Sequence, residues 1–363
     1  MGAVTRLFVA VVTVIVFSFP CLSQSPRKPP PNGKSSSRQP SQLVVVETIK
    51  IPSEPAEGFS AAQPLRCDAD GNFYLRVQTE VEPAIRKFDN KGIQQVLFSP
   101  SSIPDIKVAF ATYFSIDTEG EIRQLVGESF TDWYVITYKS NGTYKAKTRL
   151  QLGFRFRPFQ LAAFPSGELL VSGVRYDDDP NVHVKLPFTA IVSVHGTLLK
   201  QVLLKDDETM SQVAAGGPAI VPEGRRFGNS AIEGGAMEAA ADGNVYMMRR
   251  LSPAIVHAIS PGGEVVKQFR IDPGDADFQP VSMQIAGYRI AVLFFRSHAR
   301  SQTLPEDVVV KVVDLEGHDL ATYDHVGKSG MGIALVCYSP VRERFTFLTT
   351  TENFLGFAAA EPR

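Results

Sequence analysis

Two closely spaced acids and a glycine, Asp68, Asp70 and Gly71, stand in the segment CDADGNFYL between two apolar runs. Carboxylates in an oxygen-rich turn are the ligands that Ca²⁺ prefers. Four later segments of the same pattern all keep the glycine, whereas only two of them keep an acid at the position of Asp70. The position of Asp70 is taken in them by Glu119, Ser166, Asp242 and Ala286. A cation site would need the carboxylate, whereas a turn needs only the glycine, so the segment is predicted to be a hairpin corner.

The other reactive residue types form no known catalytic or metal-binding motif. The acid run Asp177, Asp178 and Asp179 lacks the alternation of a calcium loop, which favours a solvated loop. The sequence contains no G-x-S-x-G nucleophile elbow and no G-x-G-x-x-G after a strand. No two histidines have the i, i+4 spacing of a helical zinc site; they are His183, His195, His257, His298, His318 and His325. No metal site is therefore predicted.

Two hairpin patterns alternate along the chain. The first has its corner glycines at Gly71, Gly120, Gly167, Gly243 and Gly287, and the second, which follows each first one, at Gly92, Gly142, Gly196, Gly263 and Gly317. Around each corner, apolar and polar residues alternate with the period of a half-buried strand. Each pair of hairpins is therefore predicted to form one four-stranded antiparallel sheet.

The end of the chain offers only three strands for a sixth sheet, at 332–339, 344–350 and 353–360. A strand without a local partner, LVVVETIKI at 43–51, stands before the first hairpin and can supply the fourth. Pairing the first strand with the last closes a ring and removes exposed sheet edges. We therefore expect residues 42–363 to form an all-β, six-bladed β-propeller, with a long β-sandwich as the alternative.

The paired pattern, DADGNFYL at Asp68 to Leu75 followed by IRKFDNKG at Ile85 to Gly92, resembles the NHL-repeat and related six-bladed propellers. The resemblance covers nearly all of residues 42–363 and supports the fold. It implies little about function, because such propellers include binding scaffolds, lactonases and lyases.

The first strand of each blade lines the central channel of a propeller, which points to a row of candidate ligand-binding residues. Counting five residues back from each first-hairpin glycine gives the row Arg66, Ser115, Ala162, Glu238 and Ser282. Arg66 and Glu238 fall in blades on opposite sides of the ring. We expect Arg66, Ser115, Glu238 and Ser282 to orient an anionic or metal-bound ligand; in the alternative, each charge is solvated or neutralised locally.

The longest insertion, Lys205 to Gly234, supplies a second set of candidates. Arg225, Arg226 and Phe227 within it could cap a channel mouth and contact an anionic group. A disordered excursion is the alternative.

Two cysteines remain after the N-terminal segment. Cys67 and Cys337 fall on inner strands of blades one and six, which ring closure makes neighbours. A disulfide there would staple the ring. Two buried thiols are nevertheless expected, because equivalent strands of adjacent blades usually stand farther apart than a bridge permits.

The N-terminus indicates export. Arg6 precedes an apolar run of about 13 residues, roughly 20 Å as a helix and too short to span a bilayer, and small residues at Cys21 and Ser23 suit cleavage before Gln24. Residues 1–23 are therefore predicted to be a signal peptide, so the mature protein is expected to be secreted or periplasmic, with no transmembrane domain. The alternatives are lipidation at Cys21 and an uncleaved N-terminal anchor. Residues 24–41, rich in Pro and Ser, are predicted to be a disordered basic linker.

The charge balance excludes a nucleic-acid partner. Residues 1–41 hold five of the 37 basic and none of the 38 acidic residues, which leaves a charge of about −6 on the rest of the chain. The sequence favours an exported propeller that acts as a ligand-binding or protein-interaction scaffold, through its channel mouth and loops. The alternative is a lactonase-like, metal-dependent hydrolase with a divalent cation near Glu238; otherwise no cofactor is predicted, and the ligand or partner stays open.

Overall fold

The computed structural model describes residues 40–51, 60–78, 83–176, 185–205, 230–296, 307–326, 334–351 and 354–363. The predicted signal peptide and linker, the Asp177–Asp179 run and the candidates Arg225, Arg226 and Phe227 lie outside these residues. Gln39–Arg363 is one compact unit. In its described part, no helix is long and apolar enough to cross a membrane.

Nearly all regular structure is strand, as predicted. Four antiparallel sheets of four strands follow one another along the chain, apart from the short helix α2 (Ser230–Glu233) and a 3₁₀ turn at Pro100–Ser102. Their strands are β2 (Ser60–Cys67), β3 (Phe73–Gln78), β4 (Pro83–Phe88) and β5 (Gln94–Phe98); β6 (Phe110–Ile116), β7 (Ile122–Gly127), β8 (Trp133–Tyr138) and β9 (Tyr144–Arg149); β10 (Phe156–Ala163), β11 (Leu169–Tyr176), β12 (Lys185–Val192) and β13 (Leu198–Val202); and β14 (Ala236–Ala239), β15 (Val245–Arg249), β16 (Ala254–Ile259) and β17 (Val265–Ile271).

The remaining strands form one sheet of eight, where two sheets of four were predicted. Its order is β18 (Phe278–Ala286), β19 (Arg289–Arg296), β20 (Asp307–Asp314), β21 (Asp319–Val326), β1 (Ser41–Lys50), β24 (Phe354–Pro362), β23 (Arg344–Thr351) and β22 (Ala334–Ser339). Strand β1 pairs antiparallel with β24, from Leu43↔Pro362 to Lys50↔Gly356. Its first residues also pair in parallel with β21, at Ser41↔Tyr323 and Gln42↔Asp324. This short parallel pairing is what joins the two groups of four.

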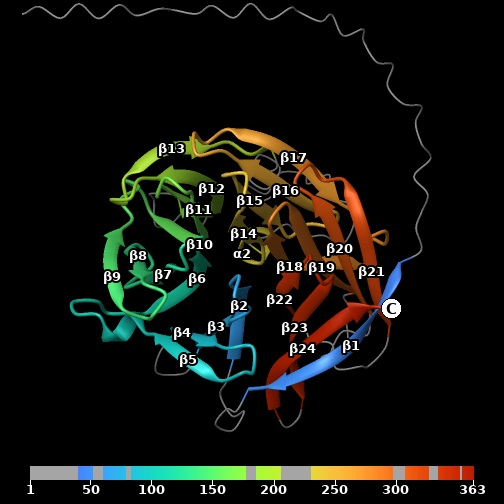
Figure 1. The fold of residues 1–363 in the computed structure, drawn as a ribbon. Helices are drawn as coiled ribbons and strands as arrows, with labels where there is room; N and C mark the ends of the chain where they lie inside the picture. The colour runs from blue at the N-terminus through green and yellow to red at the C-terminus, as the bar shows by residue number, and fades with distance from the viewer. Residues whose placement is uncertain are drawn as a thin grey trace, which may run out of the picture. The chain divides into compact units, whose positions relative to one another are not determined.

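The sheets are arranged around a common centre. The first strands contact one another in the order β2, β6, β10, β14, β18 and β22, and β22 contacts β2 again. Figure 1 shows these strands around the centre, with the blue β1 beside the red β24. The chain therefore has a propeller-like arrangement, and its first and last strands lie side by side.

Glycine corners also connect each sheet to the one before it. At Gly92, between β4 and β5, φ is +78°, and an added Cβ would lie only 2.6 Å from the carbonyl oxygen of Lys50 in β1. The corresponding corners meet the outer strands β5, β9, β13 and β17 through Gly142, Gly196, Gly263 and Gly317. Strand β1 thus offers the first sheet the same kind of outer-strand surface as the other sheets offer their neighbours.

The hydrophobic core lies between neighbouring sheets rather than at the centre of the ring. One cluster joins Ile49 and Ile51 to Leu65 and Phe73, and so packs the β1–β24 pair against the first sheet. Larger clusters fill the spaces between the following sheets. This leaves the inner strands free to present polar residues to the centre.

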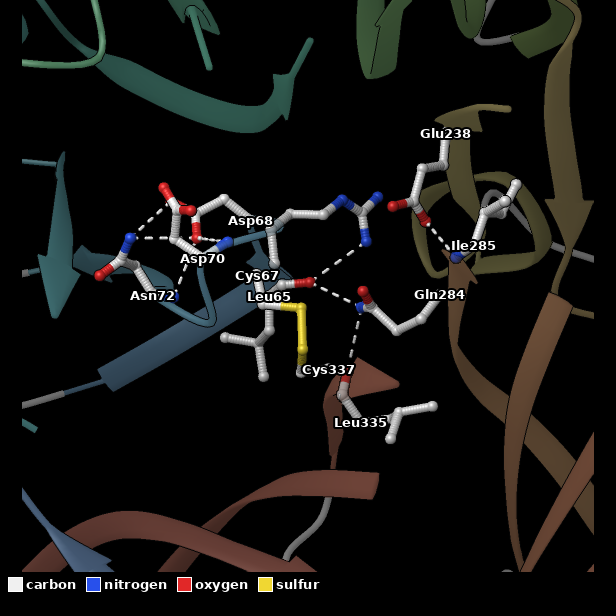
Figure 2. Close-up of a disulfide and its surroundings, with 11 residues drawn as sticks. Leu65, Cys67, Asp68, Asp70, Asn72, Glu238, Gln284, Ile285, Leu335 and Cys337 are labelled. Atoms are coloured by element: carbon white, nitrogen blue, oxygen red, sulfur yellow. Dashed lines mark hydrogen bonds between the residues drawn. A yellow bond between two sulfur atoms is a disulfide. The ribbon is translucent and has the colours of Figure 1, made fainter. Parts of the chain in front are cut away.

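A disulfide joins Cys67 of β2 to Cys337 of β22, so the expectation of two free thiols was wrong (Figure 2). The two Cα atoms are 5.3 Å apart, well within the range that a bridge permits. The bond links residues 270 positions apart in the sequence and fixes the contact between the first and last sheets.

We expect deletion of Leu43–Ile51 to destabilise the whole unit. The strand removes from water the buried side chains of Leu43, Ile49 and Ile51, each contributing about 1.5–3 kcal/mol, and covers the open edge of β24. The midpoint of thermal unfolding should fall by roughly 10 °C or more. A truncated protein that unfolds at the same temperature as the full chain would show that β1 is dispensable.

Candidate functional site

The centre of the ring is crossed by the buried side chain of Arg66, the second-last residue of β2. Its Nη2 donates hydrogen bonds to Tyr113 Oη (2.8 Å) and to the carbonyl oxygen of Met237 (3.0 Å). Its Nη1 donates to the carbonyl oxygens of Leu65 (3.2 Å) and Met283 (3.4 Å). Since β14 stands three strands away from β2 in either direction round the ring, Arg66 connects opposite sides of the propeller.

Tyr113 of β6 completes this connection. Its hydroxyl donates to the carbonyl oxygen of Met237 (3.1 Å) and accepts from the Met237 N–H (2.8 Å) and from Arg66. Burial raises the pKa of Tyr113, although Arg66 opposes the rise, so the hydroxyl keeps the proton that it donates. Burial alone would lower the pKa of Arg66, but Tyr113 and Glu238 reverse this and raise it, so the guanidinium stays charged.

Glu238 of β14 is the acidic member of the predicted central row. It retains some exposure, and its Oε2 accepts a hydrogen bond from the Ile285 N–H (3.0 Å), as Figure 2 shows. Burial raises the pKa of this carboxyl, while Arg66 and the Ile285 N–H oppose the rise. Arg66 and Glu238, both members of the predicted row, therefore influence each other's pKa.

The strand ladder places Gln284, rather than Ser282, level with Arg66. In the first sheet the pairing runs Cys67↔Phe73↔Phe88, and in the fifth group it runs Ile285↔Ile290↔Val313. Cys67 and Ile285 therefore occupy equivalent positions, and so do the residues that precede them, Arg66 and Gln284. Counting back from Gly287 missed this because the turn between β18 and β19 is shorter than the others.

Gln284 is a second tie between inner strands. Its Nε2 donates to the carbonyl oxygens of Leu65 in β2 (2.9 Å) and Leu335 in β22 (3.2 Å), as the dashed lines in Figure 2 show. Ser282, two residues earlier on the same face, accepts a hydrogen bond from the Leu335 N–H (3.0 Å) through its Oγ. Both side chains therefore stabilise the join between β18, β22 and β2.

Two other polar residues of the inner strands are buried without a partner among the described residues. They are Ser115 of β6, through its Oγ, and Gln160 of β10, through both amide atoms. Gln160 and Tyr113 were not among the sequence-based candidates. Each lies two residues before a member of the predicted row, Ala162 and Ser115 respectively, and strand alternation could have identified them.

The corner at Asp68 is fully used by its own hairpin. The Asp68 carboxylate accepts hydrogen bonds from the Asn72 N–H (2.9 Å), the Asn72 side chain (2.8 Å) and Tyr74 Oη (2.8 Å), and pairs with Lys87 (3.4 Å). Burial opposes ionisation, but the bonds from Asn72 and Tyr74 outweigh it and lower the pKa of Asp68. The segment is a hairpin corner, as predicted, and not a cation loop.

The central residues do not suit a divalent cation. Among the described residues, no group of three or more His, Cys, Asp or Glu side chains could hold a metal ion. The one carboxylate at this level, Glu238, also interacts with the positive charge of Arg66, which would repel a cation. The donor set therefore fits a charged structural tie better than a metal centre.

We predict that Arg66→Met strongly destabilises the protein. The substitution keeps the bulk of the side chain but removes the guanidinium donor to the Met283 carbonyl oxygen. It also removes one of the two donors to the Met237 carbonyl oxygen and one of the two donors to the Tyr113 hydroxyl. The loss should be about 3–5 kcal/mol in the free energy of unfolding, measured in urea. The control is Arg149→Met, which removes an exposed arginine paired with Asp132 and should cost about 1 kcal/mol or less.

A pH dependence follows from Glu238. Because its pKa is raised in the folded protein, the folded state binds more protons than the unfolded state between the ordinary glutamate pKa and the raised one. The contribution of Glu238 to stability is therefore present at low pH and lost as the pH rises through that window. Glu238→Gln should flatten this part of the curve of melting temperature against pH; an unchanged slope would contradict the assignment.

Comparison with known proteins supports the fold alone. No family model and no curated protein sequence matches this chain. A Bacteroides fragilis protein described as exported has a similar structure, with 8% identity, a TM-score of 0.53, and coverage of 88% of this chain and 95% of its own. An inactive virginiamycin B lyase from Staphylococcus aureus, with 10% identity and a TM-score of 0.48, aligns over 89% of this chain and 100% of its own. The chain is similar to β-propeller-type proteins.

Proposed function

We propose that this chain is an exported β-propeller that acts as a ligand-binding or protein-interaction scaffold. The observation that carries the proposal is the use of Arg66. Its guanidinium donates four hydrogen bonds, three to main-chain carbonyl oxygens and one to Tyr113. These bonds hold the inner strands together and leave the central positive charge few donors for a ligand. Binding then falls to the two ends of the ring, where loops and corners are accessible.

We further propose that the ring has six blades. The eight-stranded sheet then represents two blades, β18 to β21 and β22 to β24 with β1, joined by the two parallel pairs at Ser41 and Gln42. The cyclic contact order of the inner strands and the packing of Gly92 on β1 support this count. Because the two hairpin motifs alternate along the chain, we keep the prediction that they are NHL-like repeats.

Export is proposed from the N-terminal sequence. A short apolar run after Arg6, small residues before Gln24 and a Pro- and Ser-rich linker are typical of a secreted or periplasmic protein. A disulfide between Cys67 and Cys337 agrees with an oxidising compartment. The description of the B. fragilis protein as exported is compatible with this proposal.

The competing hydrolase is tested by metal binding. The scaffold proposal predicts that neither the purified full chain nor its Glu238→Gln variant binds Ca²⁺, Mg²⁺ or Zn²⁺ stoichiometrically in a calorimeter, and that neither hydrolyses a lactone. Stoichiometric binding of one of these ions that is lost in Glu238→Gln, together with ion-dependent lactone hydrolysis, would replace the scaffold by the enzyme.

A further inference from the structure

One surface of the second and third sheets combines an exposed aromatic ring with a positive charge that no described carboxylate balances. The guanidinium of Arg157 lies 5.1 Å from the ring centroid of Phe159 and 5.9 Å from that of Phe130. The Phe130 side chain is large and apolar, yet the residue is 57% exposed. Arg157 is partly buried, and its Nε is enclosed without a hydrogen-bond partner.

Arg157 forms no ion pair with a described carboxylate. The arginines that form ion pairs among the described residues are Arg123, Arg149, Arg296 and Arg344. Arg155, two residues before Arg157, also lacks an ion pair there and stacks on Tyr176 at 5.7 Å. The chain beyond its N-terminal 41 residues carries more acids than bases, so positive side chains without carboxylates are not forced on this surface by composition.

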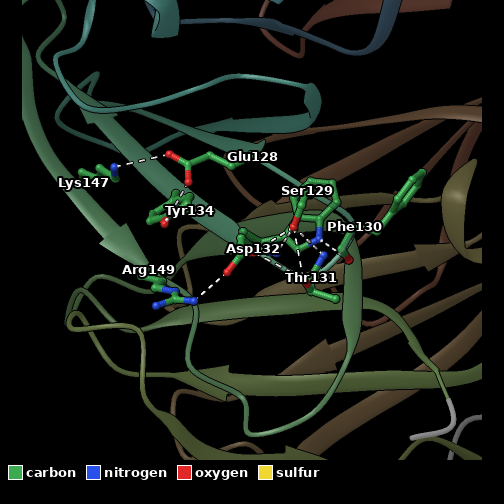
Figure 3. A network of polar contacts seen from close by, with 9 residues as sticks. Glu128, Ser129, Phe130, Thr131, Asp132, Tyr134, Lys147 and Arg149 are labelled. Carbon is green, nitrogen blue, oxygen red and sulfur yellow. Dashed lines mark hydrogen bonds and ion pairs between the residues drawn. The ribbon is translucent and has the colours of Figure 1, made fainter. Parts of the chain in front are cut away.

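The turn that carries Phe130 is braced, as Figure 3 shows. Ser129 Oγ donates to Asp132 (2.8 Å), and the indole N–H of Trp133 donates to the carbonyl oxygen of Phe130 (3.2 Å). The Phe130 ring also lies 5.0 Å from that of Phe110. The exposed ring is therefore held in place rather than left on a loose loop.

The acids of the same turn are occupied by other cations. Asp132 pairs with Arg149 at 2.6 Å, and Glu128 pairs with Lys147 at 3.7 Å while accepting a hydrogen bond from Tyr134 (Figure 3). Neither acid pairs with Arg157. The turn thus brings an aromatic face to Arg157 without bringing a negative charge.

We propose that Phe130 and Arg157, with the buried ring of Phe159 packed against the guanidinium, form a binding site for a small ring compound that carries an oxyanion, either carboxylate or sulfate. A guanidinium stacked on an aromatic ring keeps its N–H edge free for a bidentate contact with an oxyanion. Phe130 offers the ring of the ligand an apolar face. The inference deepens the scaffold proposal, on which it rests, by naming a ligand class.

Calorimetric titration of the full chain tests the site with four probes. They are 4-nitrobenzoate, 4-nitrophenyl sulfate, the uncharged 4-nitrobenzyl alcohol and inorganic sulfate. We expect at least one of the two aromatic anions to bind at least tenfold more tightly than the alcohol and than inorganic sulfate. The better of the two identifies the oxyanion. Equal affinity for the alcohol, or no binding of either aromatic anion, would overturn the proposal.

Substitutions then locate the binding. Arg157→Gln should weaken the aromatic anion roughly 10- to 100-fold, as expected for loss of a hydrogen bond to a charged group, and Phe130→Leu should weaken it less. Arg157→Lys keeps the charge but loses the planar fork. Its loss of affinity should therefore be intermediate between the losses in Arg157→Gln and Phe130→Leu. The matched control, Lys200→Gln, removes a positive charge already paired with Glu264 and should leave affinity unchanged.

The variants also separate this inference from the scaffold proposal. Arg157→Gln should unfold at the same temperature as the unsubstituted protein. A loss of affinity in this variant would then not be due to unfolding. Binding unchanged in Arg157→Gln but still selective for anions would reject this site and leave the scaffold proposal standing. Metal-dependent lactone hydrolysis would reject the scaffold proposal. The effect of Arg157→Gln on anion binding would still decide, by itself, whether the anion binds at this site.

Discussion

The structure depends on one buried cation at the centre of the ring. The hydrophobic clusters pack neighbouring sheets against each other but do not connect opposite ones. Arg66 makes that connection, because its guanidinium bonds to carbonyl oxygens of β14 and β18 and to Tyr113 of β6. A charged group with several donors can do this at a narrow centre, where every neighbouring carbonyl oxygen needs a partner. The same bonds leave Arg66 few means to recognise a ligand.

The region around Arg66 also contains the join between the ends of the ring. Cys67, the next residue, is bridged to Cys337, and Gln284 bonds to carbonyl oxygens on both sides of that bridge. Farther out, β1 pairs with β24 and receives the Gly92 corner. The first and last sheets are thus joined at the inner strands by a covalent bond. Farther out they meet where the Gly92 corner packs on β1, which pairs with β24 in the last sheet. Such a rigid frame suits a protein that presents binding surfaces at its ends.

The sequence predicted the local features well. Alternating residues and corner glycines located the strands, and the lone strand at 43–51 pointed to its partner at the other end of the chain. The segment around Asp70 could be assigned to a hairpin because the glycine recurs at every later corner, whereas the acid recurs at only some of them. These features depend on residues close together in the sequence, or on comparison between repeats.

What the sequence could not give depends on distances across the ring. Nothing in the order of residues says that Arg66 reaches Met237, or that β2 and β22 approach closely enough for the disulfide of Cys67. Gln284 escaped because a shorter turn shifts its count from the glycine by two residues. The parallel pairing of β1 with β21, which merges two groups of strands, arises from the path of Ser41 and Gln42 and has no motif. The Phe130 and Arg157 contact joins two sheets and is equally invisible in the sequence.

Hydrogen exchange in the native state tests the role of Arg66 most directly. Amide protection should be compared, strand by strand, between the full chain and Arg66→Met under conditions where both remain folded. The account predicts that protection falls together in β2, β14 and β18, although these strands are far apart in the sequence. Loss of protection confined to β2, with β14 and β18 unchanged, would contradict the claim that Arg66 ties opposite sides of the ring.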